Sequence, residues 1–169
     1  QALKHHPEPT VQREAMRRVL AGLQLSAGLS ERGIATLDEG QRHLQTLGPS
    51  GQNLIGPEVY LMLAVALRGT PRRAESLPLV DAACQTLASQ RGASTLPALR
   101  CRAVRAWLAA GNLKAEARVN AVQAFRAAKA RLFEAGLHER HPLRAELLAA
   151  EAELLADEPA LRAQAAALR

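Results

Sequence analysis

The sequence predicts an all-α fold built from consecutive pairs of helices. Hydrophobic residues make up 48% of the chain but aromatic residues only 2%, so Leu, Ala and Val must fill the core. Apolar residues recur at three- and four-residue steps, and no long segment alternates with period two. Close packing of Ala-rich helices suits this composition, whereas β-sheets favour β-branched and aromatic side chains.

Eight helices follow from the periodicity. The clearest pattern is that of the sixth helix, in which Ala117, Ala121, Phe125, Ala128 and Leu132 share one face. We expect the helices near residues 9–26, 30–47, 57–68, 72–91, 96–110, 113–135, 142–156 and 159–168.

Prolines mark the expected starts of several helices, because a proline in the first turn removes no hydrogen bond. Those that precede an apolar-periodic run are Pro9, Pro57, Pro97 and Pro142. Pro78 is different, since it follows Ser76 inside the expected fourth helix. Either Ser76 caps that helix or the helix is kinked there.

A repeat is visible in the glycines that end the expected first helices. Gly28, Gly69 and Gly111 are separated by 41 and 42 residues. A small residue follows each of them: Gly33 and Ala74 at five residues, and Ala117 at six. Regular spacing of this kind is typical of tandem helix-turn-helix repeats.

These repeats resemble the tetratricopeptide repeat, in the long-pitch form found in kinesin light chains. Only Trp107 supplies the large aromatic residue before the turn, and Asp157-Glu158-Pro159 replaces the fourth glycine. The resemblance implies a single domain, residues 1–169, forming a right-handed superhelical solenoid of about four antiparallel helix pairs. The repeats would span residues 9–47, 57–91, 96–135 and 142–169.

The same resemblance implies a concave groove lined by the first helices. The expected partner-binding residues are Arg18, Val59, Leu63, Leu67, Cys101, Arg102, Arg105 and Leu108. Such a groove is apolar in the middle and positive at its flanks, which suits a peptide with acidic and aliphatic side chains. The alternative is that the arginines are merely solvated and that a genome of high G+C content favours them.

The formal net charge of +6 leaves three classes of partner open: nucleic acid, an anionic membrane and an acidic protein. We do not expect nucleic acid, because aromatic residues for stacking are few and Trp107 should be buried. We expect no membrane insertion, because the longest apolar run, residues 59–67, is too short to span a bilayer.

Residues that could carry chemistry show no productive pattern, so we expect no enzyme activity, no cofactor and no metal. His138 and His141 lie in an expected loop without further ligands. Glu146, Glu151 and Glu153 belong to an ordinary polar helix face. Cys84 and Cys101 lack metal-ligand spacing, and whether they pair stays open.

Together these observations predict a non-catalytic protein–protein interaction scaffold that holds a protein or an acidic peptide. Because the chain begins at Gln1 rather than Met, we expect a piece of a larger bacterial regulatory or signalling protein, with the cytoplasm as the favoured compartment. One alternative is an autoregulatory or homo-oligomerisation module of a signalling kinase or transcription regulator. Another is an RNA-binding helical repeat.

Overall fold

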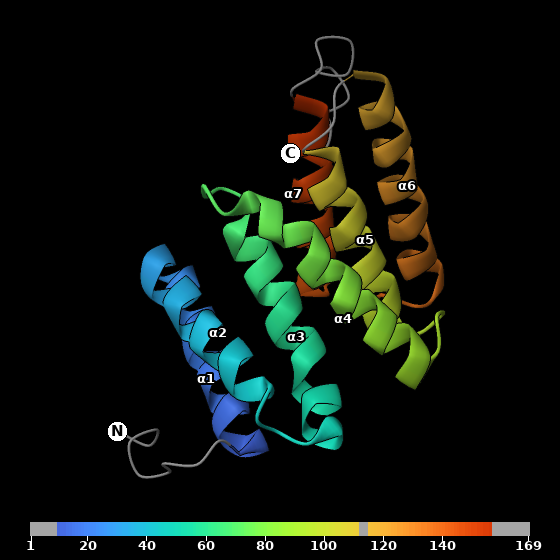
Figure 1. The fold of residues 1–169 in the computed structure, drawn as a ribbon. Coiled ribbons are helices and arrows are strands. Elements are labelled where there is room, and N and C mark those ends of the chain that lie inside the picture. The colour runs from blue at the N-terminus through green and yellow to red at the C-terminus, as the bar shows by residue number, and fades with distance from the viewer. Residues whose placement is uncertain (1–9, 112–114, 157–169) are drawn as a thin grey trace. The chain divides into compact units, whose positions relative to one another are not determined.

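A computed structural model describes residues 10–111 and 115–156, and within these ranges all regular structure is helical. The all-α prediction is therefore confirmed for the described part of the chain (Figure 1). The expected helix at 159–168 lies outside it. The helices are α1 (Val11–Ser26), α2 (Ser30–Leu44), α3 (Pro49–Leu67), the short 3-10 helix η2 (Arg73–Glu75), α4 (Ser76–Arg91), α5 (Leu96–Ala110), α6 (Ala115–Glu134) and α7 (Pro142–Ala156).

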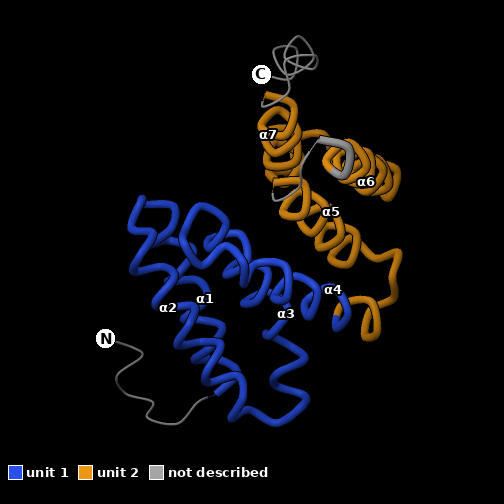
Figure 2. Tube along the Cα trace, turned by 45° about the horizontal axis from the view of Figure 1, so that its top comes forward, with its two compact units in different colours: residues 1–86 blue, residues 87–169 orange. Residues whose placement is uncertain are grey.

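The chain divides into two compact units, residues 1–86 and residues 87–169 (Figure 2). The division falls inside α4. Each unit has a hydrophobic core cluster of its own.

In unit 1, α1 and α2 form an antiparallel hairpin on which α3 packs (Figure 1). The side of α2 that faces inward carries Gly33, Leu37, Gly40 and Leu44, at steps of four and three residues. A Cβ at Gly33 would lie 2.7 Å from Cδ2 of Leu25. Glycine is therefore needed there for α2 to approach α1 so closely.

Glycine also ends three of the described helices, α1, α4 and α6, by adopting a left-handed backbone conformation; the glycine after α4 is Gly92, with φ 89°. Gly28 has φ 76° and closes α1, while Leu29 N donates to Gln24 O at 2.9 Å. Gly136, with φ 91°, closes α6 in the same way. Gly111, by contrast, has φ −64°, which any residue can adopt. Of the glycines in the predicted 41- and 42-residue spacing, only Gly28 has a positive φ.

The third helix begins at Pro49, well before the expected position at 57. Pro49 occupies the first turn of α3, and Gly48 O accepts hydrogen bonds from Gly51 N and Gln52 N. The segment 49–56, which lies between the two helices expected at 30–47 and 57–68, is thus helical, and Pro57 lies inside α3 rather than at its start. α4 begins at Ser76, so Pro78 lies in its first turn.

A buried polar cluster joins α1 to α2. Glu14 and Arg17 are only 1% and 2% exposed, and Arg17 Nη1 donates to Glu14 Oε1. Arg17 also contacts Glu39 Oε1 at 2.8 Å and His43 Nδ1 at 2.7 Å. The contacts of Arg17 with Glu39 and His43 cross from α1 to α2, so they depend on the native register of the hairpin.

In unit 2, α5, α6 and α7 pack around a core of Leu and Ala with one aromatic anchor, Phe125, which is fully buried. The face of α5 that packs inward is rich in alanine, including Ala103, Ala106 and Ala110. Small side chains let α5 and α6 approach closely, as the composition predicted.

We predict that Glu14→Ala lowers the free energy of unfolding by about 3 kcal/mol, because it leaves the buried Arg17 guanidinium with the partly exposed Glu39 as its remaining carboxylate partner. The double variant Glu14→Leu/Arg17→Met should lose less, because it buries no unpaired charge. Urea unfolding followed by far-ultraviolet circular dichroism measures both. The control is Arg18→Ala, which removes a half-exposed ion pair and should cost less than about 1 kcal/mol. A double variant less stable than Glu14→Ala would contradict the prediction.

Candidate functional site

The predicted groove residues fall into two groups according to burial. Val59, Leu63 and Leu67 are 1%, 0% and 0% exposed and belong to the core cluster of unit 1. Cys101 and Leu108 are also buried, and neither cysteine of the chain is a free thiol. These apolar side chains contribute to packing rather than to an open surface.

The remaining predicted residues are arginines that reach the surface. Arg18 is half-exposed and lies 3.8 Å from Glu58. Arg102 and Arg105, on α5, line a hollow of about 330 Å³ together with Arg131 on α6. We call this hollow the arginine pocket, and its lining residues are Leu99, Arg102, Arg105, Ala106, Ala124, Ala127, Ala128 and Arg131.

The arginine pocket exists because α6 presents alanines where longer side chains would fill the space. Ala124 and Ala127 are exposed, and Ala128 is half-buried against the core of unit 2. On α5, Arg102 and Arg105 are three residues apart and share one face. Arg131 follows Ala127 and Ala128 by about one turn of α6. The lining of the pocket therefore combines apolar side chains with three arginines.

The charge of the arginine pocket is positive, and no described acidic residue lines it. The side chains of Arg102 and Arg131 make no hydrogen bond or ion pair with any residue that the structure describes. The region as a whole is basic, since residues 87–169 contain thirteen Lys and Arg against eight Asp and Glu. Residues 1–86 contain nine against eight.

Other cations of unit 2 have a structural role instead. Glu151 of α7 accepts hydrogen bonds from Arg126 Nε at 2.7 Å and from Lys129 Nζ. Burial of Glu151 opposes its charge, but the hydrogen bonds from Lys129 and Arg126 outweigh burial and hold the pKa of Glu151 below its ordinary value. Arg144 lies over the ring of Phe133, 4.0 Å from its centre.

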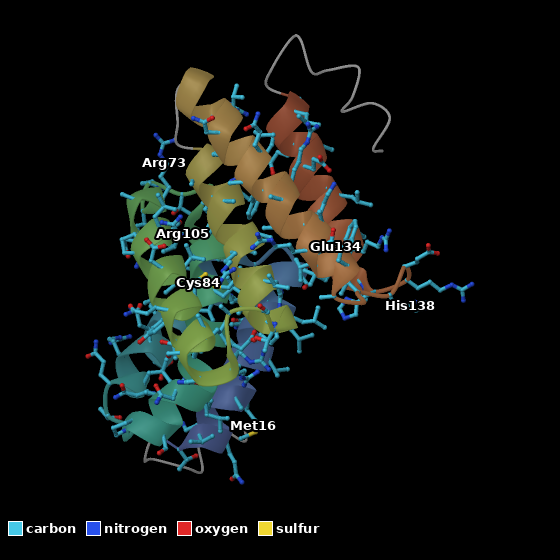
Figure 3. All side chains as sticks on the ribbon, turned by 90° about the vertical axis from the view of Figure 1, so that its right-hand side faces the viewer. Met16, Arg73, Cys84, Arg105, Glu134 and His138 are labelled. Atoms are coloured by element: carbon cyan, nitrogen blue, oxygen red, sulfur yellow. The ribbon has the colours of Figure 1, made fainter. Side chains whose placement is uncertain are left out.

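The histidines weighed as metal ligands take part in local turns. His141 Nδ1 accepts from Leu143 N at 3.1 Å, at the start of α7. His138 Nδ1 accepts from Arg140 N at 3.1 Å in the loop after α6 (Figure 3). Within residues 10–111 and 115–156, no group of three or more His, Cys, Asp or Glu is placed to hold a metal ion.

One surface feature was missed in the sequence because it lies beside a buried face of the same helix. Met16, Val19, Leu20 and Leu23 are 42%, 54%, 38% and 64% exposed and follow one another at helical steps along α1. Met16 projects away from its helix (Figure 3). We call these residues the α1 stripe. The sequence of α1 could have revealed the stripe, because its apolar residues form a second helical face next to the buried face that contains Ala21.

Comparison with known proteins identifies no relative. No family model matches the chain, and neither the curated proteins nor the solved structures contain a match. Among the described residues, no helix has both the length and the apolar character needed to cross a bilayer.

We predict that Glu151 contributes stability that is lost in acid. Its pKa is lower in the folded protein than its ordinary value of 4.5, so the unfolded state takes up the proton first. The contribution is complete above pH 4.5 and disappears as the pH falls through the folded-state pKa. Urea unfolding at several pH values, followed by the fluorescence of Trp107, should show a shallower acid decline in Glu151→Gln than in the wild type. Parallel declines would contradict the prediction.

Proposed function

We propose that this chain is a non-catalytic scaffold that binds a protein or peptide partner through the arginine pocket. We further propose that its helix pairs form a right-handed superhelix like that of the tetratricopeptide repeat, and that it serves a larger regulatory protein. The observation that supports partner binding most directly is the arginine pocket itself. Arg102, Arg105 and Arg131 line it together with Leu99 and alanines, and none of its lining residues is acidic.

The pocket suits a partner that is both acidic and aliphatic. Guanidinium groups bind anionic oxygens through charge-assisted hydrogen bonds, each worth about 1.5–3 kcal/mol. The apolar lining, made by Leu99 and alanines, would bury an aliphatic side chain next to the acidic one. If the arginines were only solvated, the apolar side chains beside them would have no ligand to bury.

We predict that Arg102→Glu/Arg105→Glu weakens binding to an acidic peptide by about tenfold or more, because it reverses the charge of the pocket. The probe is a fluorescein-labelled synthetic peptide with Glu and Leu at helical spacing, and fluorescence anisotropy measures its affinity. Circular dichroism verifies that the variant is folded.

The matched control is Arg32→Glu/Arg42→Glu, which makes the same change in net charge at exposed positions of α2. It should bind the peptide nearly as well as the wild type. Equal losses of peptide affinity in the two variants would show that net charge alone causes the effect. No loss of affinity in either variant would exclude the pocket as the binding site.

The α1 stripe favours a second candidate function, self-association. Its exposed side chains Met16, Val19, Leu20 and Leu23 are all apolar, so they offer no charged group to select a different partner. Unit 1 is nearly neutral, with nine basic and eight acidic residues, so two copies would not repel each other strongly. We therefore propose a second copy of the chain as the occupant of the stripe.

We predict that the chain forms a dimer at high concentration and that Leu20→Glu/Leu23→Glu makes it monomeric, because each dimer would bury four like charges. Multi-angle light scattering across a concentration series measures the molar mass. Leu54→Glu, which places one charge on an exposed leucine of α3, is the control and should leave the dimer intact. A monomeric wild type at every concentration would exclude self-association through the stripe.

A further inference from the structure

The arrangement of the arginines distinguishes between the anions that an acidic partner can offer. Arg102 and Arg105 come from α5, whereas Arg131 comes from α6. An anion in the pocket would therefore have arginines of both helices as neighbours. We propose that the group bound in the arginine pocket is a phosphoryl monoester carried on a side chain of the partner peptide. This proposal rests on the proposed function and specifies its ligand.

The number and direction of the acceptor oxygens favour phosphate. A carboxylate presents two oxygens in one plane, and one bidentate guanidinium engages both of them. A phosphoryl group presents three terminal oxygens around phosphorus, so guanidinium groups on opposite sides can each find an acceptor. Arg102 and Arg131 line the pocket from different helices, so the two side chains start from different sides of it.

The charges around the pocket favour a dianion. Arg126 and Lys129 share the buried Glu151, and Arg100 lies 3.9 Å from Glu146, so these cations already have carboxylate partners. Arg102 and Arg131 make no such pair with a described residue. A phosphoryl group carries a charge of about −1.5 to −2 at pH 7, against −1 for a carboxylate.

The surroundings favour a phosphopeptide over a nucleic acid or free phosphate. Single-stranded nucleic acids bind basic grooves that also offer aromatic side chains for stacking. No described aromatic residue lines the arginine pocket, and Phe125 is fully buried in the core of unit 2. Free phosphate would leave the apolar lining of Leu99, Ala124 and Ala127 without a contact. A phosphorylated residue beside an aliphatic one uses both parts of the pocket.

The experiment compares three synthetic peptides of one sequence that carry phosphoserine, glutamate or serine at the same position. Isothermal titration calorimetry with the full chain should show that the phosphoserine peptide binds about tenfold or more tightly than the glutamate peptide. Affinity for the phosphoserine peptide should fall as the pH is lowered through about 6, where the phosphate becomes a monoanion. Affinity for the glutamate peptide should stay nearly constant over the same range.

Two variants connect the effect to the pocket. Arg131→Gln removes one guanidinium, and Ala127→Leu fills the hollow without a change of charge; both positions are exposed, so the core stays intact. Each should weaken binding of the phosphoserine peptide about tenfold, whereas Arg140→Gln, in the loop before α7, should not.

Each outcome decides a different point. Equal affinities for the phosphoserine and glutamate peptides would overturn the phosphoryl assignment and leave the proposed function standing. Displacement of the phosphopeptide by inorganic phosphate or by a single-stranded oligonucleotide at equal concentration would overturn the choice of a peptide as the carrier. Failure of all three peptides to bind would remove the proposed function as well.

Discussion

Close approach between helices is the constraint on which the described structure depends. With aromatic residues at only 2% of the chain, the helices cannot be held apart by large side chains and must pack Leu against Ala and Gly. Gly33 shows this limit in unit 1, where a Cβ would lie 2.7 Å from Leu25. In unit 2, alanines on α5 and α6 have the same role. The arginine pocket follows from it, because the alanines of α6 that extend beyond the core leave the hollow that the arginines line.

The buried carboxylates Glu14 and Glu151, one in each unit, both lie beside cations. Glu14 with Arg17, and Glu151 with Arg126 and Lys129, place ions in surroundings where an unpaired charge would cost several kcal/mol. Arg17 also pairs with Glu39 of α2, and Glu151 of α7 pairs with two cations of α6, so buried charge joins neighbouring helices. The arginines of the pocket differ, since Arg102 and Arg131 are not committed to a described carboxylate. This contrast separates the cations that hold the fold from those that are available to a ligand.

Much of the helical structure could be predicted from the sequence, because it depends on local periodicity and turn residues. The ends of α1, α4, α5 and α7 lie where apolar spacing, glycine and proline indicated. The start of α3 could not be predicted from the sequence, because a proline such as Pro49 is equally compatible with a loop and with a first helical turn. The spacing of Gly28, Gly69 and Gly111 also gave no guide to backbone conformation, which depends on how each helix ends.

The candidate site was predicted only in part, because burial depends on partners distant in sequence. Arg17 and Arg18 are adjacent, yet about 100° of rotation around the helix buries one and leaves the other half-exposed. Arg102 and Arg105 could be chosen from the expected first helices, but Arg131 is close to them only because α6 returns along α5. Val59, Leu63 and Leu67 have the apolar character of a groove, but α1 and α2 cover them.

A measurement of how closely α5 packs against α6 in solution tests the close approach of these helices most directly. Nuclear Overhauser effects between the methyl groups of Leu99 and Ala128 can be measured by nuclear magnetic resonance on methyl-labelled protein. The account predicts strong effects between these two residues, because both belong to one core cluster and line the same pocket. Leu99 methyl groups with no effect to any alanine of α6 would contradict the close approach of the two helices, and with it the arginine pocket.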